Sequence, residues 1–112
     1  MNYKSKYIWF NGELVEWDQA VEHTVNHALH YGTAVFEGIR FYPTSKGPAI
    51  FRLADHIKRF LFSASVLKMD LGYSHQELEK AIKLTVAKNE ISNGYIRPIA
   101  WYGEDKMGLN PA

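Results

Sequence analysis

Residues Leu53 to Met69 carry apolar side chains at the spacing of an α-helix, and no other feature constrains the fold of this chain as strongly. Asp70-Leu71-Gly72 then ends the predicted helix. The apolar positions on its one face are Leu53, Ile57, Phe60, Leu61, Ala64 and Leu67. A helix with a single apolar face buries that face against another layer of secondary structure, so the chain needs a sheet or a second helix beside it.

A second helix is predicted to begin after Ser74, because Glu77 stands three residues later and completes a capping box. Asn93-Gly94 stops this helix. The residues on its buried side are Leu78, Ile82, Thr85 and Val86. Two consecutive helices with one apolar face each are suited to covering the same sheet.

Turn and strand signals surround the two helices. Asn11-Gly12 lies between two apolar-rich runs and predicts a hairpin, because both residues tolerate a positive φ. The Pro43 to Pro48 stretch interrupts a second pair of strands, and the short segment Asn26 to Gly32 ends in a glycine that suits a turn or a helix end. The predicted strands cover residues 6–10, 13–17, 33–42, 49–52 and 95–102. This order predicts an α+β fold, in which an antiparallel sheet packs with two main helices.

The composition is that of an ordinary globular domain of 112 residues, of which 46% are hydrophobic and 22% charged. Thirteen basic and twelve acidic side chains nearly cancel, which gives no support for nucleic-acid binding. The absence of cysteine excludes disulfides, thiolate nucleophiles and cysteine-based zinc sites. No stretch is long and apolar enough to span a membrane, so we expect a cytoplasmic protein without a membrane partner.

Three histidines, His23, His27 and His30, are spaced four and three residues apart. On a helix they would share one face, which is a geometry that metal ions use. The segment lacks the glutamate of the HExxH pattern, and no further ligand is evident. We therefore predict ordinary hydrogen-bonding histidines and no metal site.

Two arginines are candidates for binding an anion. Helical spacing alone makes Arg59 a surface residue of the first helix. Arg97 lies inside the apolar run Tyr95 to Ile99, where a buried guanidinium needs an anionic partner, either a protein carboxylate or an anionic ligand. Strand alternation places Tyr95 and Arg97 on the same face, an arrangement that suits recognition of a carboxylate. Gly38 sits in a strand-like run and indicates either a bulge or a close approach by a ligand.

Four separated motifs contain these candidates. The first covers residues 27–40, His-Ala-Leu-His-Tyr-Gly-Thr-Ala-Val-Phe-Glu-Gly-Ile-Arg. The other three are Phe51-Arg52-Leu53 with His56 and Arg59, then Tyr95-Ile96-Arg97-Pro98, and then Met107-Gly108-Leu109-Asn110-Pro111. In this order and spacing, and over nearly the whole chain, the sequence resembles the branched-chain amino acid aminotransferases, which are fold-type IV enzymes that use pyridoxal 5′-phosphate.

The resemblance implies an enzyme that transfers the amino group of leucine, isoleucine or valine to 2-oxoglutarate, giving glutamate, with the cofactor as electron sink. It implies that Arg59 binds the cofactor phosphate. The implied substrate-binding residues are Phe36, Gly38, Tyr95 and Arg97 and, across the interface of a homodimer or higher homo-oligomer, Tyr31, Met107, Gly108 and Leu109. No role follows for Glu37 and Arg40, which we expect only to pair in the structure.

The resemblance also implies that these residues lack the domain that carries the catalytic lysine. The Schiff-base lysine of the family lies in a large C-terminal domain outside these residues, so residues 1–112 correspond to the small N-terminal domain alone. No residue of this chain is then catalytic, and we expect the chain by itself to be inactive. Two alternatives stay open: another fold-type IV enzyme, such as D-amino acid transaminase or aminodeoxychorismate lyase, and a non-catalytic binding module.

Overall fold

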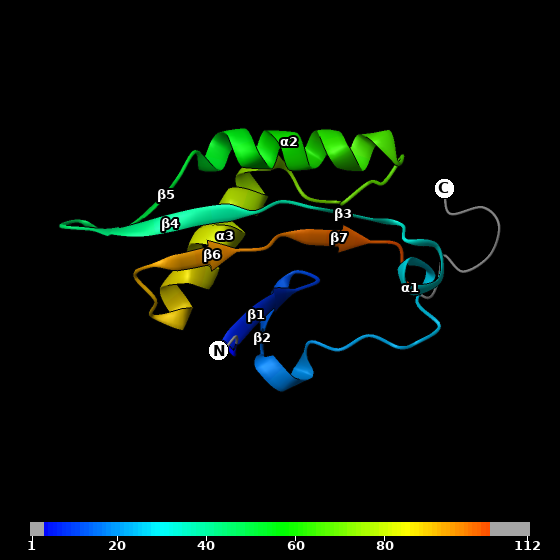
Figure 1. Cartoon of the computed structure of the whole chain (residues 1–112), viewed down its shortest axis with the longest axis horizontal. Coiled ribbons are helices and arrows are strands. Elements are labelled where there is room, and N and C mark those ends of the chain that lie inside the picture. The colour runs from blue at the N-terminus through cyan, green and yellow to red at the C-terminus, as the bar shows by residue number, and fades with distance from the viewer. Residues whose placement is uncertain (1–3, 104–112) are drawn as a thin grey trace.

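The computed structural model describes residues 4–103, and Figure 1 shows how their helices and strands are arranged. The strands are β1 (Tyr7–Phe10), β2 (Glu13–Glu16), β3 (Ala34–Phe36), β4 (Ile39–Thr44), β5 (Gly47–Ile50), β6 (Gly94–Ile96) and β7 (Ile99–Trp101). The helices are α1 (His27–Tyr31), α2 (Leu53–Val66) and α3 (His75–Asn89), and a 3₁₀ turn (Trp17–Gln19) follows β2. All strand pairs are antiparallel and form the sheets β1-β2, β3-β7 and β5-β4-β6. The predicted α+β class with two main helices is confirmed.

The core lies between the strands and the two long helices. Its buried members are Ile39 of β4, Leu53, Ile57 and Phe60 of α2, and Leu78 of α3. In Figure 1, α2 runs beside the path of β3 and β4, and α3 crosses behind β4 and β6. Burial of these apolar side chains holds strands and helices together, and it fixes which face of the strands is covered.

α2 begins at Leu53, as predicted, but it ends at Val66, three residues before the predicted end. The N–H groups of Leu67 and Lys68 bond to carbonyls three residues back, and Lys68 adopts a φ of 55°, which stops the helix. The predicted apolar face is confirmed except at Leu67, which is 37% exposed.

α3 begins with the predicted capping box. The Ser74 hydroxyl accepts the N–H of Glu77 at 3.1 Å, and the Glu77 carboxylate accepts the N–H of Ser74 at 2.9 Å. The helix ends at Asn89 and not at Asn93-Gly94, because Glu90 adopts a φ of 56°. Of the predicted inner positions, Leu78 and Val86 are buried, and Ile82 and Thr85 are half-buried.

The predicted N-terminal hairpin is confirmed as β1–β2. Asn11 and Gly12 form its turn with φ values of 51° and 98°. β2 is one residue shorter than predicted, because Trp17 begins the 3₁₀ turn. The buried Asn89 side chain fixes the hairpin to α3, since its Oδ1 accepts the backbone N–H groups of Lys6 and Tyr7, each at 2.9 Å.

The two long strands predicted over residues 33–42 and 95–102 are each divided in two, and both divisions occur at the same level. β3 pairs with β7 and β4 pairs with β6 in one common register, so Glu37-Gly38 stands opposite Arg97-Pro98. The Glu37 N–H still donates to the Pro98 carbonyl at 3.0 Å, whereas Pro98 has no N–H to return. Each side contributes two residues to this break, so it is not a bulge, which would need an extra residue on one side.

The Pro43 to Pro48 stretch was predicted to interrupt the second strand pair, and this is wrong. β4 and β5 continue through both prolines, which stand opposite each other. Phe51 N–H donates to the Arg40 carbonyl at 2.9 Å, which makes that pair hydrogen-bonded. Because bonded and non-bonded pairs alternate in an antiparallel ladder, Pro43 and Pro48 form a non-bonded pair, where the missing N–H groups are not needed.

Candidate functional site

Alternation along β3–β4 and β6–β7 places neighbouring side chains on opposite faces. Glu37 and Ile39 are buried on the face toward the core, whereas Phe36 and Arg40 are exposed on the other face. We call this second face the open face and define it by Phe36, Gly38, Arg40, Tyr95, Arg97 and Ile99, which the common register brings together.

Three of the predicted substrate-binding residues are in direct contact on the open face. Arg97 Nη2 donates to the Tyr95 hydroxyl at 2.8 Å. The Arg97 guanidinium carbon also lies 4.5 Å from the centroid of the Phe36 ring, which is a cation–π distance. The predicted common face of Tyr95 and Arg97 is therefore confirmed. Phe36 and Tyr95 remain 58% and 52% exposed, so an apolar surface and a cation lie side by side in contact with solvent.

Because Gly38 has no side chain, the Tyr95 ring can occupy the space beside its backbone. A Cβ atom at residue 38 would overlap the Tyr95 hydroxyl and would lie 2.8 Å from Tyr95 Cζ. The sequence offered a bulge or a close approach by a ligand. The structure shows a close approach, but the approaching group is the Tyr95 phenol. Glycine at this position is thus what lets Tyr95 lie across the strand toward Arg97.

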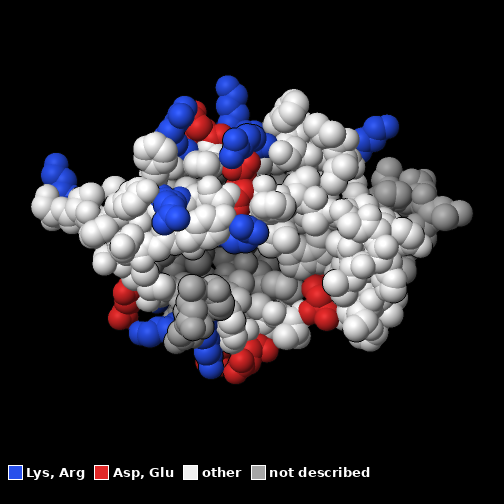
Figure 2. Space-filling view, in the orientation of Figure 1, with Lys and Arg blue, Asp and Glu red and all other residues white. Residues whose placement is uncertain are grey.

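Arg97 was expected to be buried inside an apolar run, and this is wrong, because its side chain is exposed on the open face. Its partners are a hydroxyl and aromatic rings, and it forms no ion pair within residues 4–103. Figure 2 shows one basic surface over β4 and another near the junction of β6 and β7, and the second borders an acidic surface that continues toward α2. An exposed guanidinium that lies beside aromatic rings and has no ion-pair partner within residues 4–103 is suited to binding a carboxylate.

The covered face of the same break holds Glu37, whose side chain is only 4% exposed. Its two oxygens accept two hydrogen bonds from Arg59 of α2, from Nε at 2.7 Å and from Nη2 at 2.8 Å. His56, one turn earlier on α2, lies with Nδ1 2.9 Å from Glu37 Oε1. Arg59 is 67% exposed, and its Nη1 makes no hydrogen bond within residues 4–103. This end of the Arg59 guanidinium is therefore open to solvent and able to donate to an anion.

The two partners keep each other ionised. Hydrogen bonding to Arg59 lowers the pKa of Glu37 below that of an ordinary glutamate; burial opposes this shift, and His56 adds to it. The same hydrogen bonds raise the pKa of Arg59 above its usual value. Glu37 and Arg40 were expected to pair, and this is wrong, because Glu37 faces α2 while Arg40 stands opposite Tyr95 on the open face.

The contacts of Glu37 with His56 and Arg59 were not predicted, although the sequence carries a signal for them. A carboxylate inside the apolar run of residues 34–41 must find a partner if it is buried. His56 and Arg59 are spaced three residues apart, which places them on one side of a helix. The buried acid and the helical pair together would have indicated this cluster.

Tyr31 lies at the end of α1 and is 55% exposed. Asn26 caps the start of α1, and Gly32 ends it with a φ of 68°. Tyr31 contacts the His27 ring at 4.6 Å and makes no ring contact or hydrogen bond with the open-face residues. The other three residues predicted to act across an interface, Met107, Gly108 and Leu109, lie outside the described residues.

The three histidines do not share a helix face, because α1 begins only at His27. His23 accepts the N–H of Val25, His30 Nε2 lies 2.8 Å from the Thr24 carbonyl, and His27 Nδ1 lies 2.6 Å from the Thr33 hydroxyl. They are hydrogen-bonding histidines, as predicted. Within residues 4–103, no group of three acidic or histidine side chains is arranged to hold a metal ion.

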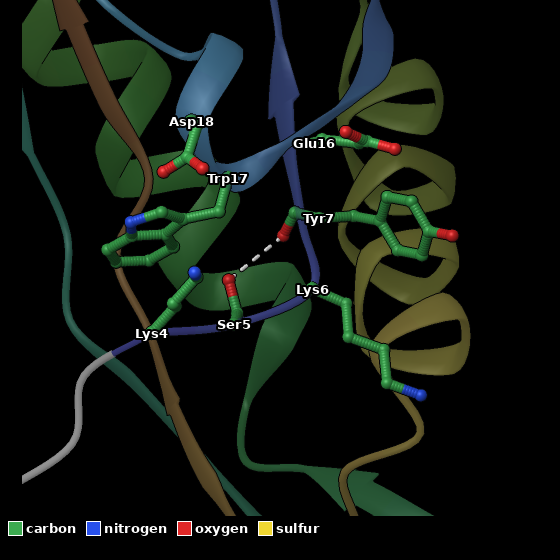
Figure 3. Close-up of a pocket in the computed structure, with 7 residues that line it drawn as sticks. All are labelled: Lys4, Ser5, Lys6, Tyr7, Glu16, Trp17 and Asp18. Carbon is green, nitrogen blue, oxygen red and sulfur yellow. Dashed lines mark hydrogen bonds between the residues drawn. The ribbon is translucent and has the colours of Figure 1, made fainter.

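A hollow of about 460 Å³ lies beside the N-terminal hairpin, away from these residues. It is lined by Lys4, Ser5, Lys6, Tyr7, Glu16, Trp17 and Asp18. Figure 3 shows that Lys6 and Tyr7 point away from Trp17 and Asp18, so these side chains do not converge on one point. None of the predicted site residues contributes to it. No helix within residues 4–103 is long and apolar enough to cross a membrane.

The chain is similar to known aminotransferases. A family model described as amino-transferase class IV matches residues 34–112. Over 108 residues, the chain is 46% identical to the branched-chain-amino-acid aminotransferases of Salmonella typhimurium (strain LT2) and Escherichia coli (strain K12). That match covers 96% of this chain but 35% of each relative.

The solved structures that the chain resembles are also branched-chain amino acid aminotransferases. The crystal structure of the T.th. branched-chain amino acid aminotransferase complexed with N-(5′-phosphopyridoxyl)-L-glutamate matches with a TM-score of 0.94 and 52% identity, over 98% of this chain and 37% of that one. The Escherichia coli branched-chain amino acid aminotransferase matches with a TM-score of 0.93 and 46% identity, over 97% and 37%. The chain therefore spans about a third of the length of these relatives.

Proposed function

Because the chain belongs to the class IV aminotransferase family, we propose that residues 1–112 form the small N-terminal domain of a branched-chain amino acid aminotransferase that uses pyridoxal 5′-phosphate. The contact of Arg97 with Tyr95 and Phe36 on the open face is the observation that carries this proposal. Such an enzyme moves the amino group of leucine, isoleucine or valine to 2-oxoglutarate.

Arg59 is the residue of this chain that would hold the cofactor. Glu37 occupies its Nε and one N–H of Nη2, which leaves Nη1 available at a side chain that is 67% exposed. A guanidinium with free N–H groups fits a phosphate dianion. The bound cofactor would supply the electron sink for the reaction. The T.th. relative was solved with N-(5′-phosphopyridoxyl)-L-glutamate, which supports the class of cofactor.

Arg97 would solve a problem of substrate specificity. The pocket must accept an apolar branched side chain in one half-reaction and the side-chain carboxylate of glutamate in the other. A wholly apolar wall would reject glutamate, because an unpaired buried carboxylate is costly. Arg97 is exposed and already has the Tyr95 hydroxyl and the Phe36 ring as partners, so it needs no anion when leucine is bound. When glutamate arrives, the same guanidinium would pair with its carboxylate.

Three further residues of the open face, Phe36, Gly38 and Tyr95, would shape the pocket. Phe36 would contact the aliphatic side chain of the substrate, and Tyr95 would face its α-carboxylate. Gly38 would contribute indirectly, because its missing side chain leaves room for the Tyr95 phenol. The lysine that forms the Schiff base would come from a large C-terminal domain, since this chain spans about a third of the relatives. Residues 1–112 alone would then be inactive.

A homo-oligomer is part of the proposal. Tyr31, Met107, Gly108 and Leu109 would reach the pocket of a partner subunit, and the exposure of Tyr31 at the end of α1 is compatible with this role. We also propose a cytoplasmic location, as expected for an enzyme of amino-acid metabolism.

The alternatives are less well supported. D-amino acid transaminase and aminodeoxychorismate lyase share the fold type, but the relatives with 46–52% identity are branched-chain enzymes. A stand-alone binding module would need no lysine domain. The length of the reading frame that encodes residues 1–112 separates these possibilities: a frame that continues into a lysine-bearing domain supports the enzyme, and a stop after Ala112 supports the module.

The decisive experiment substitutes Arg97→Met in the protein encoded by the complete reading frame. Single-turnover kinetics would measure the leucine and glutamate half-reactions separately. We expect the glutamate half to lose about 2–4 kcal/mol of transition-state stabilisation, as for a broken desolvated charge pair, and the leucine half to lose much less.

Arg40→Met is the matched control, because Arg40 lies on the open face two residue pairs from Arg97 and has no assigned role. It should leave both half-reactions unchanged. Equal losses in the two half-reactions of Arg97→Met would make Arg97 a structural residue, and the dual-substrate assignment would be withdrawn.

A further inference from the structure

The geometry of the Glu37–Arg59 pair is specific about which part of the guanidinium is used. A guanidinium has five N–H groups, and two of its edges can each form a bidentate contact. Glu37 accepts from Nε and Nη2, so it occupies the edge next to the aliphatic stem. The outer edge, formed by Nη1 and the second N–H of Nη2, has no partner among residues 4–103. A second anion can therefore bind without displacing Glu37.

Glu37 and Arg59 differ strongly in how far they are buried. The Glu37 side chain is 4% exposed, and that of Arg59 is 67% exposed. Glu37 is also fixed through its backbone, since its N–H donates to the Pro98 carbonyl at 3.0 Å. His56 Nδ1 lies 2.9 Å from Glu37 Oε1 and gives the carboxylate a further hydrogen-bond partner. The carboxylate is thus a rigid anchor, whereas a free arginine on a helix surface samples many rotamers.

From this arrangement we infer that Glu37 is a positioning residue, which holds Arg59 so that its outer edge is presented to the phosphate of the cofactor. The inference rests on the proposed function, and it adds a residue to which the family resemblance gave no role. Glu37 itself touches neither cofactor nor substrate. It acts by fixing the rotamer of Arg59 before the phosphate binds, so less conformational entropy is lost on binding.

The negative charge of Glu37 has an opposing effect on phosphate binding. A carboxylate beside Arg59 partly cancels its charge and repels a phosphate dianion, so removing Glu37 would strengthen binding if this effect dominated. The guanidinium is two-thirds exposed, and water and salt screen repulsion at such a position. By contrast, water and salt do not reduce the effect of Glu37 on the orientation of the Arg59 guanidinium. We therefore expect the loss of Glu37 to weaken cofactor binding, and the sign of the change separates the two effects.

The test measures the dissociation constant of pyridoxal 5′-phosphate in the cofactor-free protein encoded by the complete reading frame, by quenching of tryptophan fluorescence. Glu37→Gln removes the bidentate acceptor and should raise the dissociation constant about tenfold. Glu37→Asp keeps the charge but shortens the side chain, so it should raise the constant as well. Asp55→Asn is the matched control, because Asp55 pairs with Arg52 on the surface of the same helix, and it should change nothing.

A double-mutant cycle shows whether Glu37 acts through Arg59. Arg59→Lys should weaken binding, and adding Glu37→Gln to it should cause no further loss. Melting temperatures of the cofactor-free variants show which of them are folded, and Glu37→Asp serves in the cycle if Glu37→Gln does not fold.

Each outcome decides between the two claims. If the wild-type protein binds no pyridoxal 5′-phosphate, the proposed function fails, and the positioning role fails with it. If the wild type binds and Arg59→Lys weakens binding, but both Glu37 variants bind as well as the wild type or better, the positioning role alone is overturned. Independent, additive effects of Glu37 and Arg59 would also overturn it.

Discussion

Gly38→Ala tests whether the open face depends on a missing Cβ atom. The new methyl group would overlap the Tyr95 hydroxyl and would lie 2.8 Å from Cζ and 3.1 Å from Cε2. No tyrosine ring tolerates such contacts, so Tyr95 must leave its present position. Its hydrogen bond to Arg97 is then lost.

The cost to folding should nevertheless be small. Tyr95 is 52% exposed, so its ring can turn into solvent, and water replaces the lost hydrogen bond. Gly38 does not have a positive φ, so alanine fits the backbone and reduces the entropy of the unfolded chain, which is worth about 0.4–1 kcal/mol. These opposing effects should leave the free energy of unfolding within about 1 kcal/mol of the wild type.

Gly94→Ala supplies the contrast. A Cβ atom there would lie 2.9 Å from Cζ of Phe41, which is 4% exposed and has no solvent to move into. This overpacked variant should lose about 1–3 kcal/mol. Urea unfolding of the 112-residue chain measures the stabilities, and NMR of the Tyr95 ring reports its displacement. A Gly38→Ala chain that loses more than about 2 kcal/mol, or that keeps the wild-type Tyr95 signals, would refute the reasoning.

Three further predictions use urea unfolding of the same chain. Ser74→Ala breaks the capping box with Glu77 and should cost about 1 kcal/mol, whereas no loss would mean that the box contributes nothing to α3. Asn89→Ala leaves the N–H groups of Lys6 and Tyr7 without their buried acceptor and should cost about 2–3 kcal/mol; a smaller loss would show that water replaces the amide. Because the pKa of Glu37 is lowered in the folded state, its contribution to stability is present above the ordinary glutamate pKa of about 4.3 and is lost as the pH falls through the lower folded value. The stability difference between wild type and Glu37→Gln should therefore shrink between pH 7 and pH 3, and a constant difference would contradict the shift.

Features that depend on a few neighbouring residues were predictable from sequence. Asn11-Gly12 specifies its own turn, and Ser74 with Glu77 specifies the start of α3, because the interacting groups are at most three residues apart. The ends of α2 and α3 were less predictable. Lys68 and Glu90 adopt positive φ values there although neither residue type favours them, so tertiary packing decides where these helices stop.

The exposure of Arg97 could not be predicted from its surroundings in the sequence. Tyr95 to Ile99 is apolar enough to indicate a strand buried on both faces. In the structure Tyr95, Arg97 and Ile99 are exposed, while Ile96 and Ala100 pack against the core. An apolar face that is left open has the same composition as one that is covered, and only the position of the helices distinguishes them.

The break in the ladder explains why Arg59 and Arg97, the two arginines proposed to bind anions, are held on opposite faces of the strands. Pro98 was visible in the sequence, but its partners Glu37 and Gly38 follow only from pairing with a segment about sixty residues away. Glu37 and Gly38 are adjacent, so alternation sends one toward Arg59 and the other toward Tyr95 and Arg97. Deleting either residue would shift the register by one and exchange the two faces, so both arrangements would be lost together. A substitution at one position disturbs one face only, and for this reason Glu37→Gln and Gly38→Ala test the two arginines independently.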